Sequence, residues 1–199
     1  MELTQSNTVK AVAILLLLTV ITQPIYTALF IGAPDVSRNF IWGLEGIVFA
    51  LLAAFAGSAL VMAKRYTLGF SAIAFGAVLY VVQVGVGFTQ FGPFNMAAQA
   101  NAELGAIAFA VVSFAFFVYN AAKVLLGLAA VVFGMAKVKE GSKLLGNLTV
   151  LVGVVAIVAN ALVMLFGLRG FVPSPVAGAS GVLATLLVAI CLISISKED

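Results

Sequence analysis

Long apolar runs, separated by short polar segments, make up almost the whole chain. A run of about 20 apolar residues is long enough to cross the hydrocarbon core of a bilayer as an α-helix. Six runs reach this length, at residues 11–31, 40–62, 67–88, 104–136, 144–168 and 176–195. The pattern predicts an all-α, polytopic membrane protein, a six-transmembrane-helix bundle that forms one domain over residues 1–199.

The fourth run is longer than a bilayer requires. Its 33 residues would extend to roughly 50 Å as a helix, against about 30 Å of hydrocarbon. Two short spans broken near Lys123 are the alternative, but the piece that follows Lys123 would be too short to cross. We therefore expect one long helix. The connection before it, residues 89–102, is the longest, and we expect a short interfacial helix or a lid there.

Composition supports a membrane environment and the distribution of charge sets the orientation. Only 9% of the residues are charged, whereas a soluble domain has about 25%. Basic residues concentrate on the cytoplasmic side of membrane proteins. With the N-terminus inside, seven basic residues are cytoplasmic and Arg38 and Arg169 are external; the seven are Lys10, Lys64, Arg65, Lys137, Lys139, Lys143 and Lys197. We expect a multi-pass protein of the cell membrane with both termini in the cytoplasm.

The ends of the second and fourth runs resemble each other. Residues 60–64 read LVMAK and residues 133–137 read FGMAK, and Leu-Gly begins the next run in both places. Aligning the two regions pairs Gln83 with Asn160. A duplicated helical hairpin, spans 2–3 and 4–5, explains this internal repeat, although apolar helices of similar composition also match by chance.

Missing residue types exclude several kinds of chemistry. The chain has no histidine and a single cysteine, Cys191, so it lacks a haem imidazole, a histidine metal site and a CxxC pair. Nucleotide-binding and hydrolase motifs are absent as well. We expect no cofactor, no metal and no enzymatic activity. The net charge of +3 is spread between apolar runs, so we expect no nucleic-acid partner.

Four of the runs have a face of small and polar residues, which in transmembrane helices is typical of helix–helix contact. We expect these faces to meet in the core. Counted at 1.5 Å per residue from the predicted cytoplasmic ends, Glu45, Gln83, Asn120 and Asn160 lie at roughly 24–26 Å, and Gln23 and Lys123 lie nearer 20 Å. The sequence thus predicts a polar layer in the outer half of the bundle. We expect Trp42, Tyr66, Phe91 and Phe94 to be interfacial aromatic residues.

Lys123 is the most informative residue of this layer, because no other charge occurs between Leu104 and Ala136. Ionisable residues inside transmembrane segments are costly and mark functional sites. An ion pair between Glu45 and Lys123, direct or through one water, is the obvious arrangement. The layer is either a binding or permeation site or a set of hydrogen bonds that hold helices together, each worth about 0.6 kcal/mol.

Two functions fit these patterns, and the lipid bilayer is the partner common to both. The first is a small transporter or channel whose site is the polar layer. The alternative is a non-catalytic subunit or assembly factor of a membrane complex, in which the small-residue faces contact another membrane protein or a second copy. A membrane enzyme is the least favoured, since Glu45 has no second carboxylate near it in sequence.

Overall fold

A computed structural model describes residues 4–33, 36–168 and 170–195. In this part of the chain all regular secondary structure is helical. Six helical stretches are long and apolar enough to cross a membrane, as the hydrophobic pattern predicts. The α-helices are α1 (Gln5–Gly32), α2 (Asn39–Met62), α3 (Thr67–Val86), α4 (Gly92–Ala100), α5 (Gly105–Lys139), α6 (Lys143–Phe166) and α7 (Ser174–Ile195).

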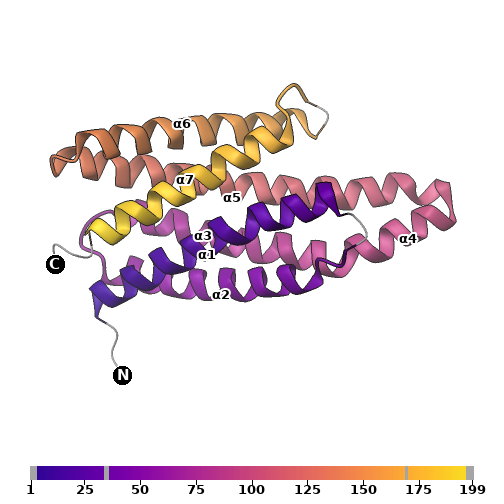
Figure 1. Cartoon of the computed structure of the whole chain (residues 1–199), viewed down its shortest axis with the longest axis horizontal. Coiled ribbons are helices and arrows are strands. Elements are labelled where there is room, and N and C mark those ends of the chain that lie inside the picture. Colours follow the sequence, from indigo (N-terminus) through magenta and orange to yellow (C-terminus); the bar gives the residue numbers. More distant parts are fainter. Residues whose placement is uncertain (1–3, 34–35, 169, 196–199) are drawn as a thin grey trace.

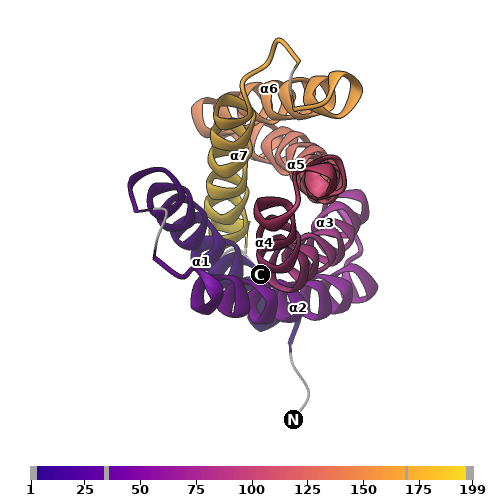
Figure 2. The ribbon, with the colours of Figure 1, turned by 90° about the vertical axis from the view of Figure 1, so that its right-hand side faces the viewer.

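Five of the helices form a closed ring. α1 contacts α2, α2 contacts α3, α3 contacts α5, α5 contacts α7, and α7 returns to α1. The end-on view shows this ring, with α6 outside it against α5 and α7 (Figure 2). Large buried side chains fill the interior, among them Leu16, Phe49, Tyr80 and Lys123. Side chains from helices that are not neighbours can therefore meet at the centre.

The contact between α5 and α6 depends on glycines. A Cβ atom on Gly134 would lie 2.9 Å from the backbone oxygen of Gly146, and one on Gly153 would lie 2.8 Å from that of Gly127. Such distances are too short for any side chain, so only glycine permits the two backbones to approach this closely. The expectation that the small-residue faces of these two helices meet is confirmed.

The fourth run is one helix, α5, as expected. The connection before it is helical as well: α3 continues through a π-helical turn η1 (Gly87–Phe91) into α4, and a short 3₁₀ turn η2 (Ala102–Leu104) leads into α5. The hairpin of α4 and the first part of α5 projects beyond the other helices (Figure 1). α1 begins, and α7 ends, at the opposite end of the bundle (Figure 1).

Trp42, expected as an interfacial aromatic residue, faces the interior of the bundle and not its surface. Its side chain is only 7% exposed, and it stacks on Tyr26 with ring centroids 5.4 Å apart and meets Phe91 edge-on at 5.3 Å. Gly87, in the π-helical turn, leaves the space that the indole occupies, because a Cβ there would overlap the indole ring. Trp42 is a core residue that fastens α1 and α2 to the end of α3.

Candidate functional site

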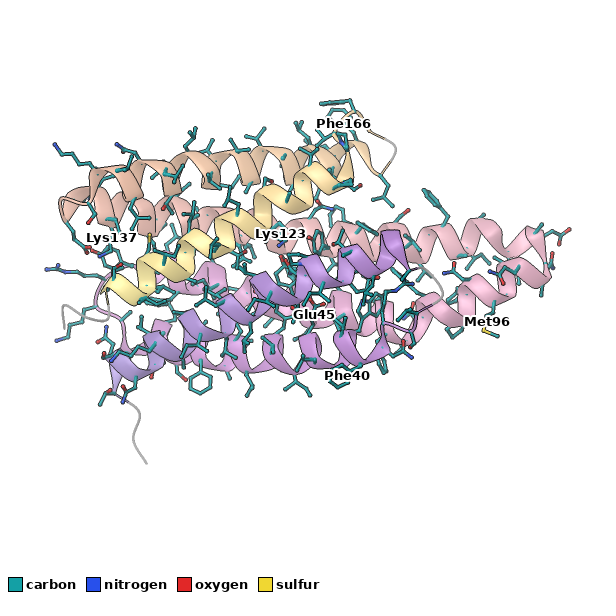
Figure 3. The ribbon with its side chains drawn as sticks, viewed as in Figure 1. Phe40, Glu45, Met96, Lys123, Lys137 and Phe166 are labelled. Atoms are coloured by element: carbon teal, nitrogen blue, oxygen red, sulfur yellow. The ribbon has the colours of Figure 1, made fainter. Side chains whose placement is uncertain are left out.

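The centre of the ring holds a group of polar side chains from four helices, which we call the interior cluster. Its members are Gln23, Glu45, Tyr80, Tyr119 and Lys123. They come from α1, α2, α3 and, for the last two, α5. Lys123 and Glu45 lie near the middle of the ring helices in the side-chain view (Figure 3).

Lys123 crosses the ring. Its ammonium group donates a hydrogen bond of 2.6 Å to Oε1 of Gln23, although α5 and α1 do not contact each other through their described backbones. The lysine side chain is completely buried, with 0% of its surface exposed. The bond therefore ties α5 to α1 across the ring, with its lysine end buried and its Gln23 end half-buried.

Two tyrosine rings flank the lysine nitrogen. The ring centroids of Tyr80 and Tyr119 lie 5.5 Å and 5.3 Å from Nζ of Lys123, within the range of cation–π attraction. Tyr80 is held in turn by Phe49, with the two rings stacked and their centroids 4.4 Å apart. The Tyr80 ring is thus held in position by packing within the protein.

The expected direct ion pair between Glu45 and Lys123 is not present. The lysine nitrogen is bound to Gln23 instead, and it does not come within 4.0 Å of a carboxylate oxygen of Glu45. Glu45 is 6% exposed, lies beside Thr22, and attracts Lys123 across the gap. Its Oε1 atom has no hydrogen-bond partner within the described chain, and neither does the hydroxyl of Tyr80.

Helix α7 contacts the cluster through two glycines, whose missing side chains leave room for Lys123 and Tyr119. A Cβ on Gly181 would lie 2.9 Å from Cγ of Lys123 and would overlap the lysine stem. A Cβ on Gly178 would lie 3.3 Å from the hydroxyl of Tyr119. The two glycines make the groove along which these side chains run.

The remaining residues of the predicted polar layer have other contacts. Asn120 donates to the backbone oxygen of Phe116 in its own helix, at 2.6 Å. Asn160 donates to Ala156 in α6 and, at 3.1 Å, to Ala177 in α7. Gln83 is half-buried. None of these three makes a hydrogen bond to Lys123 in the described structure, so the layer separates into the interior cluster and individual helix contacts.

Sequence reasoning missed the tyrosines and the α7 glycines. A signal for Tyr119 was available, because it lies four residues before Lys123 and hence on the same helix face. Tyr80 occurs on the polar face of its run, three residues before Gln83. Nothing in the sequence pairs Gly178 and Gly181 with those side chains, since the packing of α7 against α5 decides it.

A second buried lysine lies at the other end of α5. Lys137 is 1% exposed and forms a 2.6 Å ion pair with Glu140 one turn later. Tyr66, in the turn between α2 and α3, donates to the same carboxylate at 3.4 Å. Burial raises the pKa of the Tyr66 hydroxyl above its usual value, and the negative charge of Glu140 adds to the effect. This group closes the end of the bundle where Lys64, Arg65, Lys139 and Lys143 also occur.

The interior cluster has the composition of a cation site. It combines one carboxylate, one amide oxygen and two aromatic faces around an ammonium group. Among the residues that the structure describes, no group of three acidic, cysteine or histidine side chains could hold a metal ion. The cluster offers an amide oxygen, a carboxylate and two aromatic faces to an amino group.

No family model, curated protein or solved structure matches this chain. The function is therefore argued from the geometry of the site alone.

Proposed function

We propose that the six long helices cross the cell membrane with both chain ends on the cytoplasmic side. The basic residues of the α2–α3 and α5–α6 connections support this orientation, because positive charge favours the cytoplasmic face. They are Lys64, Arg65, Lys139 and Lys143. α1 begins and α7 ends at this same end of the bundle (Figure 1), as an even number of spans requires. We also propose that the hairpins α2–α3 and α5–α6 arose by duplication. Their second helices differ in position, since α3 belongs to the ring and α6 lies outside it.

The function that we propose is transport of a small solute through the ring, with the interior cluster as the binding site. The observation that carries it is the carboxylate oxygen of Glu45 that has no hydrogen-bond partner, buried in the same cluster as the buried Lys123. Helix association needs only amide and hydroxyl hydrogen bonds, whereas an ionisable side chain in a membrane interior is costly, and more so when one of its oxygens has no hydrogen bond. We infer that Glu45 is kept in this position, despite the cost of its burial, because it binds a solute.

The conformation described here is then the closed one. Lys123 is 0% exposed and Tyr80 is 1% exposed, so neither membrane face has access to the centre of the cluster. A transport cycle requires a second arrangement in which part of the ring separates. α7 is the natural moving element in this proposal, since it contacts the cluster through glycines and without a hydrogen bond to Lys123.

Flux into proteoliposomes tests the proposal. The purified protein would be assayed with a panel of inorganic cations, amines, amino acids and sugars, and we expect flux of one class in the wild type. Glu45→Gln and Gln23→Leu should abolish that flux, while Leu151→Ala, on the exposed face of α6, should leave it unchanged. Absence of flux for every class, together with no ligand-induced rise in melting temperature, would refute transport.

A second candidate function is that of a non-catalytic subunit, and the outer face of α2 supports it. A shallow groove there is lined by Ala53, Ala54, Gly57, Ser58, Val61 and Met62, and a Cβ on Gly57 would meet nothing within 4 Å. Small residues on an uncovered face allow another helix to approach closely. Native mass spectrometry should then show a complex that Gly57→Leu disrupts, whereas a monomer for both proteins would exclude this function.

A further inference from the structure

The interior cluster contains more cation ligands than Lys123 uses. An ammonium group can donate three hydrogen bonds, and in the described structure Lys123 donates one, to Gln23. Oε1 of Glu45 and the hydroxyl of Tyr80 are buried in the same cluster and have no hydrogen-bond partner in the described structure. The Glu45 carboxylate is within electrostatic range of both tyrosines and of the lysine. The cluster therefore offers hydrogen-bonding groups that Lys123 does not use.

The geometry of the ligands indicates which kind of cation fits. Calcium and magnesium ions require six or more oxygen ligands, and the cluster presents mainly aromatic faces. Those faces recognise organic ammonium groups. The amide oxygen of Gln23, 2.6 Å from the lysine nitrogen, needs an N–H donor, which a quaternary ammonium lacks. A primary amine in its charged form meets both conditions.

Resting on the proposed transport function, we propose that the solute is a small primary amine, bound as its ammonium ion between Tyr80, Tyr119, Gln23 and Glu45. Lys123 is then a tethered equivalent of the solute that occupies the site while the ring is closed. Two ammonium groups in one desolvated site repel each other, so arrival of the amine displaces the lysine. The stem of Lys123 lies against Gly181 and is not locked there by a branched side chain.

The inference is tested by removing the tethered amine and supplying a free one. Lys123→Ala deletes Cγ, Cδ, Cε and Nζ, and n-propylammonium has the same four heavy atoms. The variant should melt at a lower temperature than the wild type, and n-propylammonium chloride should raise its melting temperature in a saturable way. Neither n-propanol, the neutral equivalent, nor sodium chloride should do so. Leu126→Ala, which opens a cavity at a buried position three residues along α5, is the control and should not respond.

Changes within the cluster then identify the ligands. In the Lys123→Ala background, Tyr119→Leu and Glu45→Gln should each weaken n-propylammonium binding roughly tenfold, which corresponds to the loss of one good cation contact. Tyr119→Phe keeps the aromatic face and should bind nearly as well as its parent. Equal stabilisation by n-propanol, or unchanged binding in Tyr119→Leu and Glu45→Gln, would overturn the inference.

A second variant covers the case in which Lys123→Ala does not fold. Gly181→Ala keeps the lysine and forces its stem out of the groove. Isothermal titration should show tighter n-propylammonium binding to this variant than to the wild type. An affinity no higher than that of the wild type would contradict the displacement of Lys123 by the amine.

Uptake of labelled n-propylammonium by wild-type proteoliposomes separates this inference from the proposed function. Binding to Lys123→Ala without flux of any solute in the wild type refutes transport and supports the ammonium site. Flux of some other solute, without stabilisation of Lys123→Ala by the amine, refutes the ammonium site and supports transport.

Discussion

At the scale of single residues, the decisive contact is between a glycine and a lysine. Gly181 has no side chain where the stem of Lys123 passes, and a Cβ there would lie 2.9 Å from its Cγ and 3.0 Å from its Cε. The position of the ammonium group, and with it the hydrogen bond to Gln23, depends on this absence. Gly181 is consequently a positioning residue for the cluster although it has no polar side chain.

We predict that Gly181→Ala lowers the free energy of unfolding by about 1–3 kcal/mol, the usual cost of overpacking a filled interior. In a Lys123→Ala background the same change should cost close to nothing, because the stem with which it collides is gone. Unfolding in mixed micelles measures both values. Gly85→Ala, where a Cβ meets nothing within 4 Å, is the matched control and should be neutral or slightly stabilising. If Gly181→Ala lowered the free energy of unfolding equally in both backgrounds, the added methyl group would be colliding with a residue other than Lys123.

At the scale of helices, the polar layer divides into contacts of different kinds. Asn160 joins α6 to α7 through Ala177, and it lies on the helix outside the ring. Gln23 and Lys123 join α1 to α5 across the ring. The Asn160–Ala177 contact is a structural hydrogen bond between helices. The Lys123–Gln23 contact belongs to the proposed site.

We therefore predict that Asn160→Leu lowers stability by roughly 0.6 kcal/mol, the average for a hydrogen bond between transmembrane helices. It should leave n-propylammonium binding to the Lys123→Ala protein unchanged. Gln23→Leu should lower that binding. If Asn160→Leu lost as much binding as Gln23→Leu, Asn160 would have to be counted among the residues of the binding site.

The glycine contacts between α5 and α6 allow a stronger test of helix packing. Gly153→Leu should destabilise the protein by more than about 2 kcal/mol, because a large side chain cannot fit against the backbone of Gly127 without separating the helices. Gly85→Leu, on the exposed face of α3, should change stability by less than about 0.5 kcal/mol. Similar effects of the two substitutions would contradict the close contact.

At the scale of the whole molecule, the proposed orientation places the α5–α6 connection in the cytoplasm and the α4 hairpin outside. Single cysteines at exposed Ser142 and Ala100, in a Cys191→Ser background, report the two faces. A membrane-impermeant maleimide should label Ala100→Cys in intact cells and Ser142→Cys only after lysis. Labelling of both in intact cells would refute the topology.

Hydrophobic run length was sufficient to predict the helices, because a span needs only enough apolar residues to cross. It could not predict ring closure, which depends on how each helix rotates against its neighbours. Counting depth put Gln23 and Lys123 at the same level, and these two residues do bond. The direct bond to Glu45 was predicted from opposite charge and similar depth, but the lysine nitrogen binds the amide oxygen of Gln23, which lies at its own level.

The hairpin of α4 and α5 gives the molecule two unlike faces. With 35 residues, α5 is about 52 Å long, some 20 Å more than the hydrocarbon of a bilayer. On the face with the short connections, headgroups and their bound water would screen the loops from anything bulky. On the other face, the hairpin of α4 and the first part of α5 would extend beyond the headgroups. An antibody fragment, a protease or the ectodomain of a neighbour would first meet the turn between α4 and α5 at the tip of the hairpin, where Asn101 and Glu103 are exposed (Figure 1).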